Sequence, residues 1–196
     1  MKMDGADLFK TIFPGFFEKE YIRSIPAGAA FEEQILDLRE FSPEALQVSC
    51  PGHVTFGLYQ GDMAPVHEAV GSVVKGWLPN FTAGKEIYCA FDGEKIVSFC
   101  LLDDFGTYQG LRIGAPGCVG TIPAYRKRGI GLKMVQNATA ILKERGYDLS
   151  YIHYTAVGLI AKIQVQQYVH VLHKKNFHSL LYNFHYTGAS DFILFF

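Results

Sequence analysis

Three basic residues and two glycines stand together in the segment Tyr125–Gly131, whose sequence is YRKRGIG. Glycine lets a backbone approach a ligand closely because it has no Cβ atom. The side chains of Arg126, Lys127 and Arg128 add positive charge beside that backbone. Close backbone approach combined with basic side chains favours the binding of an anion, most naturally a phosphate.

The patterns on either side place this segment at the start of a helix. The run Cys118–Pro123 before it predicts a strand that ends at a proline turn. Gly146 marks the end of the helix predicted after it. The apolar residues of that helix recur at helical spacing: Ile130, Met134, Val135, Ala138, Ile141 and Leu142. Unpaired N–H groups and the helix dipole would then face the anion, so the sequence predicts a site for a phosphorylated cofactor.

The remaining chain alternates between strand and helix patterns, as in an α/β protein. The hydrophobic spacing predicts a helix over 64–78 and strands over 53–59, 86–91, 95–102, 111–122 and 147–155. A hairpin is expected at Asp92-Gly93, because this dipeptide is a strong signal for a tight turn. Before residue 50, the residues Phe31, Ile35 and Leu38 have near-helical spacing.

Composition sets the broad class of the protein. A chain of 196 residues with 49% hydrophobic content can form one enzyme-sized domain with an extension. The formal net charge of −1 argues against a general nucleic-acid binder, and the four cysteines form no C-x-x-C pair, so free thiols are expected. The sequence has neither a signal-peptide pattern nor the roughly 18 consecutive apolar residues of a membrane span. We therefore expect a cytoplasmic protein that binds neither nucleic acid nor a membrane.

The pattern Arg126-x-x-Gly129-x-Gly131 resembles the pyrophosphate loop of the GNAT superfamily of acetyl-coenzyme A-dependent N-acyltransferases. The predicted order of elements over about residues 53–156 is also similar to the order in that family. The resemblance implies an α/β (α+β) fold with a mixed, partly splayed β-sheet flanked by helices. It further implies a GNAT-like domain over 51–196, with residues 1–50 as an N-terminal extension packed on the core.

The resemblance also implies how acetyl-coenzyme A would be held. The backbone of a strand would bind the pantetheine arm, and an N–H near Val119 would polarise the thioester carbonyl. The implied cofactor-binding residues are Cys118, Val119, Gly120, Thr121, Arg126, Lys127, Arg128, Gly129, Ile130 and Gly131. The implied activity is acetyl transfer by direct attack of a primary amine, without a metal. The acceptor would be a small molecule or a peptide, and a homodimer is compatible with the sequence.

Several residues are candidates for proton transfer. An attacking primary amine must lose a proton, and family members often use a carboxylate near the fourth strand. The segment Gly114–Thr121 contains no carboxylate. The candidates for the base are therefore Asp103 and Asp104 at the predicted end of the third strand, and Tyr151 and His153 on the fifth.

The tail of the chain departs from the family pattern. Residues 156–175 are expected to form the next helix, in which Tyr168 or His173 would protonate the departing thiolate. The tail over 157–196 is atypical and has a single acidic residue. His170 and His173 stand three residues apart, but no third ligand is evident, so no metal is expected.

Two other phosphate-binding patterns do not fit. A Rossmann fingerprint needs a third glycine where Met134 stands, and a P-loop needs a Gly-Lys-Ser/Thr sequence that this chain lacks. One alternative stays open, namely a GNAT-fold sensor or interaction module that binds acyl-coenzyme A without turnover. The carboxylate-free fourth strand and the atypical tail favour this alternative.

Overall fold

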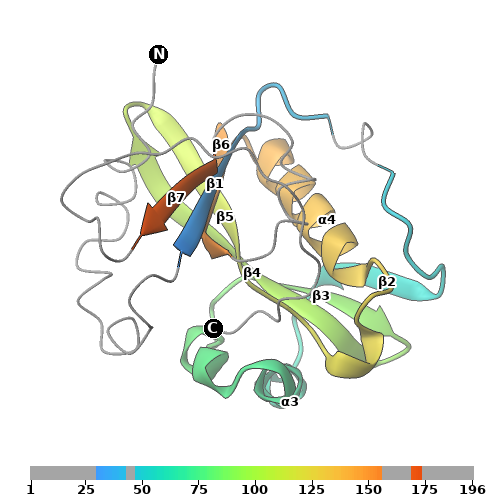
Figure 1. The fold of residues 1–196 in the computed structure, drawn as a ribbon. Coiled ribbons are helices and arrows are strands. Elements are labelled where there is room, and N and C mark those ends of the chain that lie inside the picture. Colours follow the sequence, from blue (N-terminus) through green and yellow to red (C-terminus); the bar gives the residue numbers. More distant parts are fainter. Residues whose placement is uncertain (1–29, 43–46, 156–168, 174–196) are drawn as a thin grey trace. The chain divides into compact units, whose positions relative to one another are not determined.

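A computed structural model of the chain describes residues 30–42, 47–155 and 169–173 (Figure 1). Of residues 30–34, 153–155 and 169–173 only the backbone is described. The chain divides into two compact units, one built on residues 37–150 and the other on the segments that flank them. The basic loop belongs to the unit of residues 37–150.

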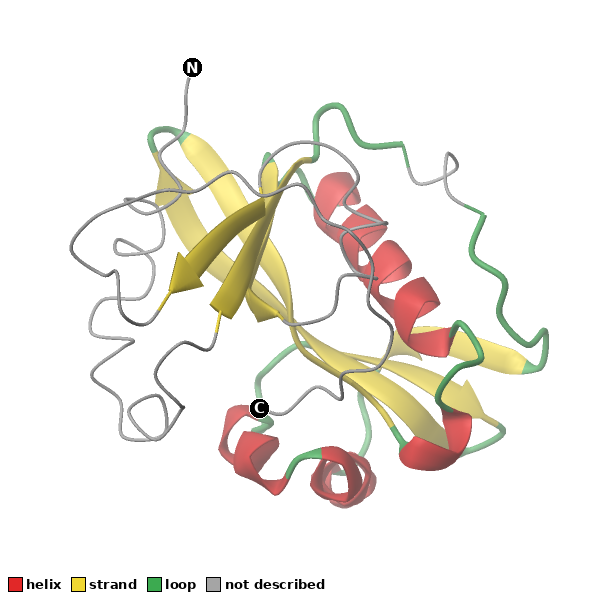
Figure 2. Cartoon of the chain, viewed as in Figure 1, coloured by secondary structure: helices red, strands yellow, loops and turns green. Residues whose placement is uncertain are grey.

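The unit of residues 37–150 is built on a mixed β-sheet (Figure 2). Strands β2 to β5 are antiparallel neighbours in chain order, and β5 pairs in parallel with the start of β6. The strands are β2 Val54–Leu58, β3 Ile87–Asp92, β4 Lys95–Tyr108, β5 Leu111–Thr121 and β6 Leu149–Thr155. The parallel register joins Ile113 to Leu149 and Gly114 to Ser150. The predicted mixed sheet is confirmed, whereas the splayed gap stays a prediction.

The predicted hairpin between β3 and β4 is confirmed. Asp92 pairs with Lys95, which leaves Gly93 and Glu94 as the two-residue turn. Gly93 has a φ of 59°, a left-handed value that glycine adopts without the steric penalty of a Cβ atom. This turn sets the register of the first two residue pairs, and the register then shifts by one residue between Phe91 and Ala90.

The predicted end of the next strand is wrong. β4 continues to Tyr108 and enters β5 through a tight turn at Gln109 (φ 50°) and Gly110 (φ 82°). Positive φ at both turn residues matches the twist of a hairpin, but glutamine is a weak sequence signal for such a turn. Asp103 and Asp104 therefore lie inside a strand rather than at its end. Since successive strand residues face opposite sides of a sheet, the two carboxylates point in different directions.

The first predicted helix is shorter than expected. α3 spans Met63–Val73, and the Asp62 side chain caps its first turn. Val74 is extended, with a φ of −148°, and ends the regular helix. The short 3₁₀ helix η3 follows over Lys75–Asn80 and includes Pro79, which cannot donate a helical hydrogen bond.

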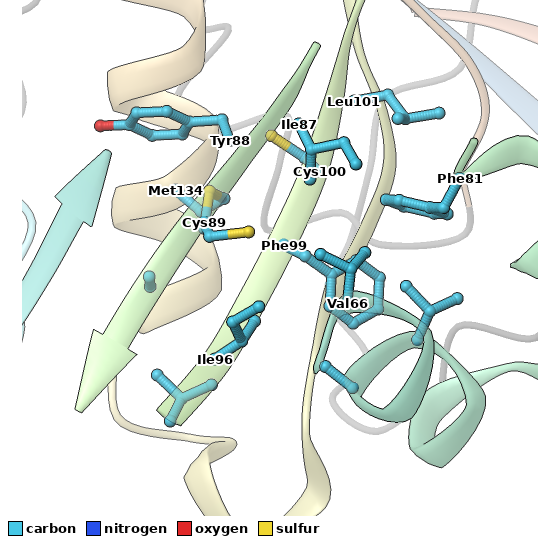
Figure 3. Packing of buried hydrophobic residues seen from close by; sticks show 14 of the residues in the cluster. Val66, Phe81, Ile87, Tyr88, Cys89, Ile96, Phe99, Cys100, Leu101 and Met134 are labelled. Atoms are coloured by element: carbon cyan, nitrogen blue, oxygen red, sulfur yellow. The ribbon is translucent and has the colours of Figure 1, made fainter. Parts of the chain in front are cut away.

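Helices pack on both faces of the sheet. α4 spans Ile130–Glu144, close to the predicted range, and contacts β3, β4 and β5, whereas α3 contacts β4 and β5. Figure 3 shows Met134 of α4 and Val66 of α3 on opposite sides of the strands. Between them the core contains fully buried residues that include Cys89, Val97, Phe99 and Cys100. The strands are thus covered on both sides, and their backbone is fixed where the site is built.

The second unit contains the strands β1 Ala30–Asp37 and β7 Val169–His173, which are antiparallel. Ala30 lies opposite His173 in their register. Two predictions are therefore wrong, because residues 30–37 were expected to be near-helical and 169–173 to be part of a helix. Three apolar residues within eight positions do not separate a helix from a strand, and the partner that decides between them is more than 130 positions away in the chain.

Candidate active site

β5 carries a β-bulge immediately before the basic loop. The register with β4 shifts by one residue between Gly117 and Gly120, so that Cys118 and Val119 together face one residue of β4. Cys118 has a φ of 48°, in the left-handed region. A bulge takes backbone groups out of the regular ladder and redirects them. The bulge coincides with the residues predicted to meet the pantetheine arm and the thioester.

The chain leaves β5 through the 3₁₀ helix η4, which spans Pro123–Tyr125. The Nε atom of Arg126 donates a hydrogen bond to the Thr121 carbonyl at 3.0 Å. The Tyr125 hydroxyl donates to the Asp92 carboxylate at 2.5 Å, and this hydrogen bond raises the pKa of Tyr125. These two contacts fasten the basic loop to the end of β5 and to the β3–β4 hairpin.

Gly129 is the N-cap of α4 and has a φ of 78°. A Cβ atom at this position would lie 1.9 Å from the carbonyl oxygen of Ser49. Side chains are therefore excluded here by the backbone of the chain itself, in addition to any ligand. Sequence reasoning attributed this glycine to ligand approach alone, and Ser49 was missed because nothing local links residue 49 to residue 129.

The first turn of α4 is open to an anion. The first hydrogen bond of the helix runs from the Lys133 N–H to the Gly129 carbonyl at 2.9 Å, so the N–H groups of residues 130–132 have no acceptor within the helix. Within the described part of the chain, no side chain caps this turn and no acidic residue lies in it. At Gly131 a Cβ atom would lie 2.9 Å from Thr121 Oγ1, so this glycine keeps the turn close to the end of β5.

The charges around this turn suit a pyrophosphate. Arg126, Lys127 and Arg128 are all exposed. The Arg128 guanidinium lies 5.2 Å from the centre of the Tyr125 ring, and Lys127 adopts a φ of 60°, which is unfavourable for a residue with a side chain. Amides without a helical partner, a positive helix end and basic side chains together provide the donors and the charge that an anion such as a phosphate prefers.

The last residues of β5 are held by β4. Ser98 is fully buried, and its hydroxyl donates to the Gly120 carbonyl at 2.7 Å and lies 3.0 Å from Thr121 Oγ1. A Cβ atom at Gly120 would approach the Phe99 ring to 2.4 Å. Side-chain space at Gly120 is therefore taken by the core, which leaves only its backbone for a ligand. Ser98 was missed because it lies within an apolar strand pattern.

Asp103 is a largely buried carboxylate beside the bulge. Its Oδ1 atom lies 3.4 Å from Nζ of Lys85, and its side chain is 18% exposed. Its Oδ2 atom would lie 2.5 Å from a Cβ atom at Gly117, the residue before the bulge. Burial raises the pKa of Asp103, and the nearby Lys85 opposes that rise. Of the predicted bases, Asp103 is the one that the described structure brings against β5 at the bulge.

Two other predicted bases have different surroundings. Asp104 forms an exposed ion pair with Arg112 at 3.0 Å. A hydrogen bond from the Gly106 N–H, followed by the Arg112 contact, lowers the pKa of Asp104. Asp104 therefore lacks the burial of Asp103 and is held by Arg112 instead. Tyr151 is fully buried.

The remaining catalytic candidates lie in the second unit. His153 is on β6 and His173 is the last residue of β7, and only their backbone is described. Tyr168 lies outside the described residues. The residue that protonates the leaving thiolate therefore stays a prediction.

Cys118 is a residue of the bulge, and its thiol is a poor nucleophile. Burial raises the pKa of Cys118 to about 11, although a hydrogen bond from Asn80 Nδ2 to the sulfur (3.6 Å) opposes this. A thiol with this pKa is almost entirely protonated near neutral pH, and the thiolate is the reactive form. Chemistry through an acyl-cysteine at this position is therefore disfavoured.

Over residues 30–42, 47–155 and 169–173, histidine, cysteine, aspartate and glutamate side chains nowhere gather in a group of three or more that could hold a metal ion. None of the helices in this same part of the chain has the length and apolar character that crossing a membrane requires.

Comparison with known proteins identifies the family. The model of the Acetyltransferase (GNAT) family matches residues 57–163. A search of curated proteins gave no match. Similar solved structures include a GCN5-related glucosamine N-acetyltransferase region of a fungal multi-domain β-N-acetylglucosaminidase (TM-score 0.58, 18% identity, 69% of this chain and 19% of that chain). Another is a GCN5-related N-acetyltransferase from Sphaerobacter thermophilus (TM-score 0.53, 18% identity, 76% and 50%).

These structural likenesses concern the fold, because the identities are low. The chain covers half or less of the length of both proteins, so their activities as whole proteins are not transferred to it. The mixed sheet flanked by helices and the glycine loop before α4 agree with the family match. Since the family model covers more than half of its residues, the chain belongs to the GNAT acetyltransferase family.

Proposed function

We propose that this protein transfers an acetyl group from acetyl-coenzyme A to a primary amine of a small-molecule or peptide acceptor. The donor supplies a thioester whose carbonyl carbon is open to attack by nitrogen. In the transfer a C–N bond forms, the C–S bond breaks, the amine loses one proton and the leaving sulfur gains one. No metal takes part in this proposal.

The open first turn of α4 would hold the diphosphate of the donor. Its N–H groups at residues 130–132, together with Arg126, Lys127 and Arg128, supply donors and charge. The backbone of Cys118–Thr121 would align the pantetheine arm, and the Val119 N–H at the bulge would polarise the thioester carbonyl.

One observation carries the proposal: β5 links the anion cradle to a partly buried carboxylate. The Asp103 side chain touches β5 at Gly117, and the same strand ends at Thr121, to which Arg126 is hydrogen-bonded. A base and a phosphate cradle attached to opposite ends of one bulged segment are the parts that amine acylation requires.

Asp103 would accept the proton that the attacking amine loses. Burial raises the pKa of Asp103 above its ordinary value, which makes the carboxylate a stronger proton acceptor. The segment 114–121 contains no carboxylate, but Asp103 of the neighbouring strand β4 would take its place. The position of Asp103 therefore favours an enzyme over a binding module without turnover. The proton for the leaving sulfur would come from Tyr168 or His173.

The test is thiol release from acetyl-coenzyme A with a panel of polyamines, aminoglycosides, amino acids and peptides. Asp103→Asn should lower kcat by about 10²-fold or more and leave the Kd for coenzyme A unchanged, because only proton transfer is lost. Asp104→Asn is the matched control, since it removes a neighbouring carboxylate that faces Arg112 instead. The control should retain turnover.

Two outcomes would contradict the proposal. Binding of coenzyme A without transfer to any amine of the panel would favour the binding module that lacks turnover. Failure of millimolar coenzyme A to raise the melting temperature would contradict the donor site itself, because a ligand that binds the folded state must stabilise it.

A further inference from the structure

Lys85 and Asp103 face each other across the β3–β4 ladder. Ile87 pairs with Leu101, and the Leu102 N–H donates to the Glu86 carbonyl at 2.9 Å, so continuing this register places Lys85 opposite Asp103. Directly opposite side chains are the closest pairs that a sheet offers. The 3.4 Å contact between Nζ and Oδ1 therefore follows from the register and not from a chance surface encounter.

The turn before β3 holds the backbone of Lys85. The Lys85 N–H donates to the Thr82 carbonyl at 3.1 Å, and Gly84 supplies the left-handed φ of 90° that this turn needs. The Lys85 side chain is 53% exposed, whereas that of Asp103 is 18% exposed. The ammonium group thus approaches the carboxylate from the solvent side.

The second oxygen of Asp103 lies over β5. A Cβ atom at Gly117 would be 2.5 Å from Oδ2, a separation that real Cβ atoms do not show. Gly117 has no positive φ, so the absence of a side chain there is not required by the backbone conformation. The glycine instead leaves the space that Oδ2 occupies at the edge of the bulge.

We propose that Lys85 is a positioning residue that holds Oδ1 of Asp103, so that Oδ2, in the space left by Gly117, receives the proton of the acceptor amine. This inference rests on the proposed acetyl transfer. Lys85 itself does not touch the reacting atoms. It orients the carboxylate and keeps one oxygen occupied, so that a single oxygen serves as the base.

The charged and titratable groups around Asp103 make the role of Lys85 measurable. Lys85 faces Asp103 from the turn before β3, Cys118 lies near Asp103 on β5, and Cys100 is three residues earlier on β4. Burial raises the pKa of both thiols, so near neutral pH they carry no charge. Lys85 is therefore the group that keeps the pKa of Asp103 from rising further, and its removal should raise that pKa.

The test compares Lys85→Met and Lys85→Arg in the full chain, with Lys75→Met as a control for loss of an exposed positive charge on η3. The Asp103 pKa is followed by carboxyl ¹³C NMR, assigned with Asp103→Asn, and kcat by thiol release with the best amine of the panel. Lys85→Met should raise the Asp103 pKa and lower kcat about tenfold, without changing the Kd for coenzyme A. Lys85→Arg and Lys75→Met should behave as wild type in the NMR titration.

Gly117→Ala tests whether Oδ2 of Asp103 is the oxygen that accepts the proton. The added methyl group should displace the carboxylate and lower kcat at least as much as Lys85→Met does, again with coenzyme A binding retained. Wild-type turnover in Gly117→Ala would overturn the assignment of Oδ2.

The outcomes separate this inference from the proposed function. If Asp103→Asn is inactive but Lys85→Met has the wild-type Asp103 pKa and kcat, the inference is overturned and the acetyltransferase proposal stands. If Asp103→Asn is fully active, both the assigned base and the role of Lys85 are wrong. The NMR titration needs no acceptor, so an unchanged Asp103 pKa in Lys85→Met overturns the inference even before an acceptor is identified.

Discussion

Replacement of Gly129 by alanine should destabilise the fold as well as the cofactor site. The residue has a φ of 78°, and left-handed backbone costs a residue with a Cβ atom about 1–2 kcal/mol. The new Cβ atom would also lie 1.9 Å from the Ser49 carbonyl oxygen, whereas ordinary contacts begin at 3.4 Å, so backbone must move by about 1.5 Å. Overpacking of this kind costs about 1–3 kcal/mol. We therefore expect a loss of roughly 2–5 kcal/mol in the free energy of unfolding.

Urea unfolding measures this loss as a lower midpoint at an unchanged slope. The matched control is Gly131→Ala, two residues further on, where φ is not positive and the nearest atom is the Thr121 hydroxyl at 2.9 Å. Alanine is favoured over glycine inside a helix by about 1 kcal/mol, which should offset that contact. The control should therefore unfold within about 1 kcal/mol of wild type.

Coenzyme A binding completes the experiment. A shift of α4 away from β5 would move the first-turn amides, so the Kd of Gly129→Ala should rise well above that of Gly131→Ala. A Gly129→Ala variant with the wild-type urea midpoint would refute the contact with Ser49. A variant that is destabilised but binds coenzyme A as wild type does would show that the anion is not held at this helix end.

Three further predictions follow from the same contacts. Tyr125→Phe removes the hydrogen bond to Asp92 that fastens the basic loop, and calorimetry should show a higher Kd for coenzyme A with little change in kcat. Lys127→Gly relieves a φ of 60° and should raise the free energy of unfolding measured in urea by up to about 1 kcal/mol, and a lower free energy of unfolding would contradict the strain. Because the folded-state pKa of Asp103 is raised, its contribution to stability is present at acid pH and is lost as pH rises through that pKa. In urea titrations Asp103→Asn should therefore gain stability relative to wild type as the pH rises above about 4, the ordinary carboxyl pKa, and a gain as the pH falls would contradict the raised pKa.

Elements with a strong local pattern were predictable from the sequence. The period of the apolar residues after Ile130 and the stop at Gly146 located α4 almost to the residue, and Asp92-Gly93 located the first hairpin. The basic glycine loop was found in the same way, because a phosphate cradle at a helix start is made from consecutive residues. These features depend on interactions over a few positions, which a single sequence records directly.

Features that depend on distant partners were not predictable. The full length of β4 and the strand conformation of residues 30–37 depend on hydrogen bonding to other strands. A short apolar pattern fits either a helix or a strand, so it does not reveal these partners. The base was left open among four residues, because burial beside the bulge, and not residue type, distinguishes Asp103 from Asp104.

The sequence by itself indicated the family, predicted where a phosphate would bind and suggested the kind of chemistry to look for, since these rest on local spacing and on residue types. Tertiary structure alone decided that Ser49 meets Gly129, that Lys85 stands opposite Asp103, and that Gly117 leaves room for a carboxylate oxygen. Each of these contacts joins different strands or loops through register and bulge geometry. Register is set by how whole strands pack, so no window of neighbouring residues contains it.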